Sequence, residues 1–219
     1  MDRKADLTTD AGLRPDAVAG RLLPRSFFAR PVLEVAPDLL GVVLVGRTGV
    51  SIRITEVEAY NGPADPASHA VRRTPRTEVM YGPPGFLYVY FVYGMHWCAN
   101  VVTGPDGSAS AVLLRAGEVV AGTAQARELR PSPIRETSLA RGPAAVARVL
   151  GLTGADSGAD LCRPGRPMQV RIGPAPTAIS AGPRVGITRA VDEPWRFWET
   201  GSPSVTIFRP GFRRRGPRL

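Results

Sequence analysis

Residues 86–102 read FLYVYFVYGMHWCANVV, and they indicate the fold more strongly than any other stretch. The segments Phe86–Tyr93 and Trp97–Val102 are rich in branched and aromatic residues, which are typical of β-strands. Gly94 lies between them, so the two segments are predicted to form a hairpin that turns around this glycine. Tyr93, next to the glycine, would then project from the hairpin tip.

Working outward from this hairpin, the chain alternates further short strands with short helices. Because most connections are short, the strands are expected to pair mainly in antiparallel fashion. We therefore expect an α+β (mixed α/β) fold: a single domain with a curved, mainly antiparallel β-sheet, surrounding helices and a protruding β-hairpin. The further strands are predicted at Val42–Val45, Val50–Val57, Ala111–Arg115, Met168–Ile172 and Val185–Ile187, and the helices at Val32–Leu40, Thr123–Leu129 and Pro143–Leu150.

The length of 219 residues corresponds to one domain with less ordered ends. Residues 1–23 are polar and mixed in charge, and we predict that they form a flexible N-terminal arm. The domain is expected to span residues 24–207. Residues 208–219 contain three consecutive arginines and are predicted to be a basic C-terminal tail.

The net charge of +9 favours an anionic partner, and nucleic acid is the commonest one. An alternative explanation for the positive charge is an arginine-rich genome, because arginine carries nearly all of it and Lys4 is the only lysine in the chain. Cys98 and Cys162 form no Cys-x-x-Cys pair, and no secretory signal or membrane-length apolar run is present. We therefore expect a cytoplasmic, nucleoid-associated protein with free thiols, no metal site, no cofactor and no membrane contact.

Two carboxylates of one predicted strand are candidate catalytic groups. Glu56 and Glu58 are two residues apart, so they face the same side of the strand. They are either solvated side chains on an exposed face or part of a cleft, and the nearby Tyr60 and His69 favour the cleft. Asp65 is predicted to cap a helix that places His69 in its first turn, where the helix dipole disfavours a charged imidazole.

Several other polar and aromatic residues have two interpretations each. Tyr88 and Tyr90 share one face of their strand, which is typical of a buried strand because tyrosine has a good β propensity. Tyr93 falls on the other face, where an exposed aromatic side chain at a hairpin tip can wedge between DNA bases. Arg115 is either an edge residue with its charge in water or a ligand for a carboxylate or a phosphate. Asn100 is either a structural hydrogen-bonding group or a base-reading group.

These residues lie within an ordered series of blocks that closely resembles the alkyladenine (3-methyladenine) DNA glycosylase family. The resemblance runs from about Phe27 to Ser204, nearly the whole core. The matching blocks are Ala36–Gly41, Glu56–Tyr60, Asp65–His69, Arg73–Arg76, Tyr81–Gly85, Leu87–Tyr90, Tyr93–Met95, Asn100–Thr103, Ala111–Ala116, Pro183–Ile187 and Trp195–Phe197.

The resemblance implies an enzyme that flips alkylated or deaminated purines out of double-stranded DNA and hydrolyses the N-glycosidic bond. In this pattern, Glu58 activates the attacking water and Arg115 helps to position it. Base-binding roles fall to Tyr60, His69, Tyr90 and Asn100, and insertion into the duplex falls to Tyr93 and Met95. Glu56 has no assigned role, so it is expected to be a supporting or solvated residue.

The sequence adds one independent prediction and leaves alternatives open. A lyase reaction needs an amine, but Lys4 lies in the predicted arm, so we expect a monofunctional enzyme that leaves an abasic site. A monomer is expected. The competing hypotheses are a non-catalytic nucleic-acid-binding module and a carbohydrate glycosidase that uses both glutamates. The preferred lesion among 3-methyladenine, 7-methylguanine, hypoxanthine and ethenoadenine stays open.

Overall fold

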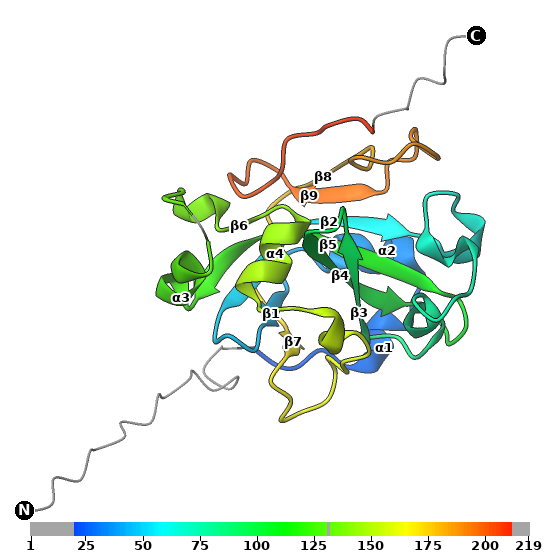
Figure 1. The fold of residues 1–219 in the computed structure, drawn as a ribbon, viewed down its shortest axis with the longest axis horizontal. Coiled ribbons are helices and arrows are strands. Elements are labelled where there is room, and N and C mark those ends of the chain that lie inside the picture. Colours follow the sequence, from blue (N-terminus) through cyan, green and yellow to red (C-terminus); the bar gives the residue numbers. More distant parts are fainter. Residues whose placement is uncertain (1–19, 131, 212–219) are drawn as a thin grey trace, which may run out of the picture.

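The computed structural model describes residues 20–130 and 132–211, and these form one sheet with helices packed against it (Figure 1). Neighbouring strands pair in antiparallel fashion in the order β3-β4-β5-β2-β1-β7, with β6 beside β5 and the β8–β9 pair beside β2. The predicted α+β class, with a curled, mainly antiparallel sheet in one domain, is confirmed. The strands are β1 Val43–Val45, β2 Ser51–Tyr60, β3 Leu87–Val92, β4 His96–Thr103, β5 Ser110–Ala121, β6 Ala140–Arg141, β7 Gln169–Arg171, β8 Ile179–Gly182 and β9 Arg196–Glu199.

Short helices cover the sheet and close its core. Helix α4 packs on β4 and β5, and α2 packs on β2 and β5. Their buried faces supply small and branched residues such as Val35 and Val146, which are fully buried beside Leu87 and Val112. The helices are α1 Arg25–Phe28, α2 Val32–Asp38, α3 Thr123–Glu128 and α4 Pro143–Val149, with single 3₁₀ turns at Gly62–Ala64, His69–Val71, Glu78–Tyr81, Glu136–Ser138 and Gly154–Asp156.

Strand β2 is the central strand that brings different parts of the chain to one place. One edge pairs with β5 along most of its length, while the other edge pairs first with β1 and then, from Glu56 to Glu58, with β9. The β2–β5 register shifts on both sides of Glu56, which marks a β-bulge. Bulges bend a strand and re-aim its side chains, and they are common beside active sites.

The predicted hairpin is present. Strand β3 pairs with β4 from Leu87–Val101 to Val92–His96, and the turn between them holds Tyr93 and Gly94 at φ 54° and φ 66°. Glycine adopts this left-handed conformation easily, whereas tyrosine does so at a cost in strain. The turn leaves the Tyr93 side chain 83% exposed and that of Met95 65% exposed.

The prediction of a strand at Val185–Ile187 is wrong. This segment is irregular, because the Val185 N–H donates to a side chain of β2 instead of to a neighbouring strand, and Gly186 has φ 76°. The strands in this part of the chain are β8 and β9. The predicted strand Ala111–Arg115 continues to Ala121 in β5.

Most of the predicted arm and tail lies outside the described residues. Leu22 pairs with Arg171, and the Leu23 N–H donates to the carbonyl of Val170, so the last residues of the arm segment follow the edge strand β7. None of the helices in the described part of the chain is long and apolar enough to cross a membrane.

Candidate active site

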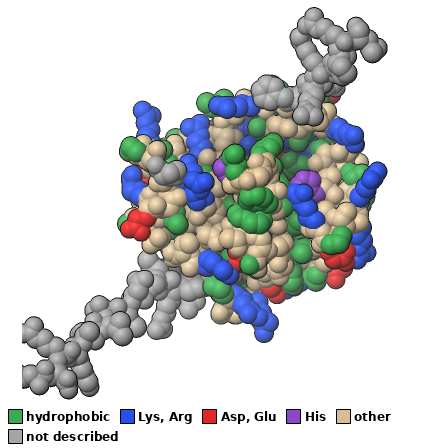
Figure 2. Space-filling model, viewed as in Figure 1, with side chains coloured by type: hydrophobic (Ala, Val, Ile, Leu, Met, Phe, Trp, Pro, Cys, Tyr) green, Lys and Arg blue, Asp and Glu red, His purple; other side chains and the backbone are tan. Residues whose placement is uncertain are grey.

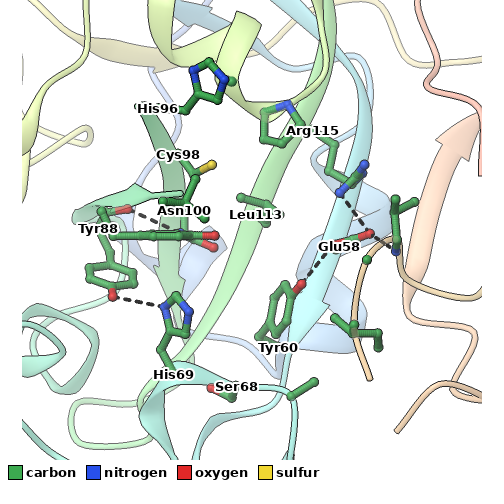
Figure 3. A pocket seen from close by; sticks show the side chains of 18 of the residues that line it. Glu58, Tyr60, Ser68, His69, Tyr88, His96, Cys98, Asn100, Leu113 and Arg115 are labelled. Atoms are coloured by element: carbon green, nitrogen blue, oxygen red, sulfur yellow. Dashed lines mark hydrogen bonds and ion pairs between the residues drawn. The ribbon is translucent and has the colours of Figure 1, made fainter. Parts of the chain in front are cut away.

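A cavity of about 370 Å³ opens between strands β2 to β5, the 3₁₀ turn at His69 and the loop at Val185. Figure 3 shows Glu58, Tyr60 and Arg115 on one side of it and His69, Tyr88 and Asn100 across from them. Of the predicted site residues, Met95 alone is absent from the cavity lining. The others line it: Glu58, Tyr60, His69, Tyr90, Tyr93, Asn100 and Arg115.

Glu58 is a fully buried carboxylate with donors on both oxygens. Its Oε1 accepts a 2.7 Å hydrogen bond from the Val185 N–H and lies 3.2 Å from Nη1 of Arg115. Its Oε2 accepts a 2.9 Å hydrogen bond from the Tyr60 hydroxyl. These three donors fix the orientation of the carboxylate at the wall of the cavity.

Arg115 joins Glu58 to the second glutamate of β2. Its Nε donates to Oε1 of Glu56 at 2.8 Å. Burial alone would lower the pKa of the Arg115 guanidinium, but the charges of Glu58 and Glu56 raise it above its usual value. The arginine is therefore a permanent cation held between two carboxylates.

Glu56 is fully buried, so of its two expected roles, supporting or solvated, the solvated one does not hold. It accepts from Nε of Arg196 at 2.7 Å, and from both the N–H and the hydroxyl of Thr206 at 2.7 Å. Burial acts to raise its pKa, but Arg115, Thr206 and Arg196 together bring the pKa below the usual value. Glu56 is thus an ionised group on the far side of Arg115 from Glu58.

The hydroxyl of Tyr60 is the donor to Oε2 of Glu58. Burial raises the pKa of this phenol well above its usual value, and the nearby charge of Glu58 adds to the effect. The hydroxyl therefore stays protonated and keeps donating to the carboxylate. The ring itself faces the cavity, where it can contact a planar ligand.

The opposite wall is a cluster of three rings. Tyr88 and Tyr90 are stacked with centroids 5.4 Å apart, and the His69 ring meets Tyr90 edge-on at 4.6 Å. Nδ1 of His69 shares a hydrogen bond of 3.2 Å with the Tyr88 hydroxyl. Burial, and then the charge of Arg76, lower the pKa of His69, so the ring is neutral at pH 7.

The prediction that Asp65 caps the helix of His69 is wrong. Ser68 caps the single 3₁₀ turn that begins at His69, since its hydroxyl accepts from the N–H of Ala70. The Asp65 carboxylate is bound by the buried Arg184. His69 is indeed disfavoured as a cation, but the cause is burial and a nearby arginine instead of a helix dipole.

Asn100 makes a structural hydrogen bond, which is one of its two interpretations, while base reading stays a prediction. The side chain is 5% exposed, and its amide donates to the carbonyl of Tyr88 at 3.4 Å. It also lines the cavity, beside Cys98 and Leu113. The hydrogen bond therefore fixes the side chain of Asn100 at the cavity wall.

Sequence reasoning missed several residues that support the site. Val185 acts through its backbone N–H, for which no side-chain signal exists. Arg184, Arg196 and Thr206 contact β2 from more than 115 residues away in the chain, and only the fold brings them there. Within residues 20–130 and 132–211, no three His, Cys, Asp or Glu side chains are grouped closely enough to hold a metal ion.

The arrangement suits a specific kind of chemistry. A fixed carboxylate beside an open cavity can take a proton from a water molecule and can stabilise a developing positive charge. Aromatic side chains on two sides of the cavity can hold a flat, aromatic ligand by stacking. The site can therefore hydrolyse a bond next to a bound planar ring.

Comparison with known proteins agrees with this geometry. The family model described as Methylpurine-DNA glycosylase (MPG) matches residues 26–203. A relative from Streptomyces avermitilis is 51% identical over 201 residues, which cover 88% of this chain and 94% of the relative. One from Frankia casuarinae is 50% identical over 217 residues, 93% of this chain and 98% of its own. Both carry the name "Putative 3-methyladenine DNA glycosylase".

Proposed function

Since the chain belongs to the methylpurine-DNA glycosylase family, whose members hydrolyse N-glycosyl bonds in DNA, we propose that Glu58 activates the water in this reaction. The enzyme would flip an alkylated or deaminated purine out of double-stranded DNA and release the base. The observation that carries the proposal is the pairing of the buried Glu58 with Arg115 at the wall of an aromatic cavity of about 370 Å³.

The chemical step follows from this pair. A water molecule next to Glu58 attacks C1′ of the flipped nucleotide as the bond from C1′ to the base nitrogen breaks. The carboxylate accepts the proton of the water, and the bonding electron pair leaves with the purine. As the bond breaks, the sugar becomes oxocarbenium-like, and the negative charge of Glu58 stabilises it. Arg115 would orient the water and hold the carboxylate.

The aromatic residues would receive the flipped base. Tyr60 lies on one side of the cavity and His69 on the other (Figure 3), and Tyr90 contacts the His69 ring, which matches a planar ring held between the two sides. Stacking contributes about 1–3 kcal/mol per base, and this offsets part of the few kcal/mol that unstacking from the duplex costs. Asn100 would contact the purine edge and disfavour the exocyclic amine of guanine.

The hairpin tip would fill the gap in the duplex. Tyr93 and Met95 are the most exposed apolar residues of the β3–β4 hairpin, and Tyr93 also lines the cavity. An apolar side chain at this place can insert between base steps where a nucleotide has left the stack. We therefore assign both residues to the duplex gap, with Tyr93 nearer to the flipped base.

The surface charge fits a duplex partner. Both histidines line the cavity, and their side chains are visible on the face shown in Figure 2. That face has hydrophobic side chains in its middle, many arginines around them and few acidic groups. Arginine contacts to phosphates would supply the sequence-independent part of the affinity. In this proposal the protein acts as a monomer on DNA in the cytoplasm.

Base release from duplexes that each carry one lesion tests the proposal. We expect an abasic site from a damaged purine, no release from undamaged DNA, and strand cleavage only after alkali treatment. Lys4 is the only lysine in the chain, so side-chain amines that could form a Schiff base are scarce, which favours a reaction that needs no amine. Binding without any base release would favour the alternative, a non-catalytic nucleic-acid-binding module. Strand cleavage in step with release would contradict the monofunctional assignment.

A further inference from the structure

The ring of Tyr60 has a buried cation on one face. The guanidinium carbon of Arg184 lies 4.7 Å from the Tyr60 ring centroid and 5.0 Å from that of Trp195, so the cation is held between two rings. Tyr60 lines the cavity, whereas Arg184 does not. The cation therefore covers the face of the Tyr60 ring that is turned away from the cavity.

Arg184 is fixed in this place by strong partners. Its side chain is completely buried, and it donates to both carboxylate oxygens of Asp65 at 2.5 Å and 3.0 Å. A further 2.9 Å hydrogen bond goes to the carbonyl of Ala59. Separating a buried charge from its partner is strongly destabilising. The ion pair with Asp65 therefore keeps the Arg184 guanidinium in the wall behind Tyr60.

The opposite wall has a similar feature. The guanidinium carbon of Arg76 lies 5.3 Å from the centroid of the Tyr90 ring, and Arg76 is an exposed residue. The carboxylate that accepts from the Tyr60 hydroxyl is Glu58, and Arg115 pairs with it. Both sides of the proposed base pocket therefore present rings that already interact with an arginine.

A guanidinium on one face of a ring weakens the attraction of the ring for a second cation. Cation–π attraction comes from the negative potential of the ring, and a cation already on the ring offsets that potential. Stacking of a neutral purine depends mainly on dispersion and buried area, which the arginine leaves in place. The arginines thus act differently on charged and on neutral bases.

We propose that Arg184 is a specificity-determining residue that biases the pocket toward neutral damaged purines, such as hypoxanthine and ethenoadenine, over cationic N-alkylated purines, such as 7-methylguanine. The inference rests on the proposed function, because it assumes that Tyr60 stacks on the flipped base. The predicted quantity is the ratio of base release from two substrates. The glycosidic bonds of these substrates differ in intrinsic lability, but this difference cancels when the ratio of a variant is compared with that of the wild type.

The test compares kcat/KM for base release from one duplex sequence that carries either 7-methylguanine or hypoxanthine. The double variant Arg184→Gln with Asp65→Asn removes both buried charges, so neither is left without a partner. We expect the ratio of 7-methylguanine to hypoxanthine release to rise at least about threefold over that of the wild type. An equal loss on both substrates, or a lower ratio, would mean that Arg184 only supports the fold.

Three further variants control this result. Arg184→Lys keeps a cation behind the ring and should leave the ratio near that of the wild type. The double variant Arg53→Gln with Glu199→Gln removes an ion pair with contacts of 2.8 Å and 2.6 Å that does not line the cavity, and it should not change the ratio. Arg76→Gln changes an exposed side chain and should raise the ratio by a smaller factor.

Arg76→Gln also gives an answer if the buried double variant does not fold. An unchanged ratio in Arg76→Gln would then overturn the premise that an arginine on a ring disfavours cationic bases, and the inference with it. A wild type that releases neither base would be a different outcome, because it would remove the proposed function itself.

Discussion

The Nε group of Arg115 donates a 2.8 Å hydrogen bond to Oε1 of Glu56, so the arginine of the active site is held from behind by a second carboxylate. Nη1 of the same guanidinium lies 3.2 Å from Glu58. The β-bulge at Glu56 allows both glutamates of β2 to reach one arginine of β5. Glu56 thus determines where Arg115 lies, and Arg115 in turn contacts the proposed catalytic carboxylate.

Glu56→Gln is predicted to destabilise the fold and to impair base release. Removing the charge leaves the buried Arg196 without its carboxylate partner, which typically costs about 3–5 kcal/mol. Chemical denaturation would measure the change in the free energy of unfolding. Glu78→Gln is the matched control, since Glu78 pairs with Arg73 on the surface, and it should have no measurable effect. Equal stability of Glu56→Gln and wild type would contradict the supporting role of Glu56.

His69 is predicted to titrate below the usual histidine pKa. Burial and Arg76 lower its pKa in the folded protein, so the folded state binds a proton less readily than the unfolded state. The stability from this group is complete above the unfolded pKa of about 6.5 and is lost as the pH falls through the lower folded pKa.

NMR can test this directly, because the chain has two histidines and His96→Asn would assign the signals. A His69 signal that titrates at or above the usual value would show that the ring is not held neutral. Arg76→Gln should move the titration of His69 upward, toward the usual value.

Tyr93→Ala is predicted to separate function from stability. The side chain is 83% exposed and its backbone is left-handed, so its removal takes away almost no packing. Base release should slow at least about tenfold, because the loss of stacking of about 1–3 kcal/mol lets the flipped nucleotide return to the duplex. Thermal unfolding and single-turnover release would be measured together. Val120→Ala, at a 46% exposed position, is the control and should change neither. Unchanged release by Tyr93→Ala would remove this residue from the DNA interface.

The sequence predicted those parts of the fold whose signals are local. Strand patterns around Gly94, together with the short connections, were sufficient for the hairpin and for an antiparallel sheet. The strands β8 and β9 were missed, because β9 is only four residues long and pairs with β2 across about 140 residues of chain. The pattern at Val185–Ile187 resembles a strand, but the N–H of Val185 donates to the Glu58 carboxylate instead of to a neighbouring strand.

The predicted site residues other than Met95 line one cavity, and each has a functional side chain in a recognisable block, while their roles stay predictions. The residues behind the cavity wall were not predicted. For Glu56 the choice between a supporting and a solvated residue stayed open, because a strand pattern cannot show that Arg196 and Thr206 approach from the C-terminal part of the chain. Asp65 resembled a helix cap, and only the fold shows that its partner is Arg184. Long-range ion pairs leave no periodic signal in a sequence.

Single-turnover base release by Glu58→Gln, from a duplex that carries one hypoxanthine, tests the central claim most directly. Glutamine keeps the size of the side chain, its single amide oxygen can still accept from the Val185 N–H, and its NH₂ group can donate to the Tyr60 hydroxyl, but it cannot take the proton of the water. We expect release to fall at least about a hundredfold, while binding to the same duplex changes little. Release at the wild-type rate would contradict the assignment of Glu58 as the catalytic base.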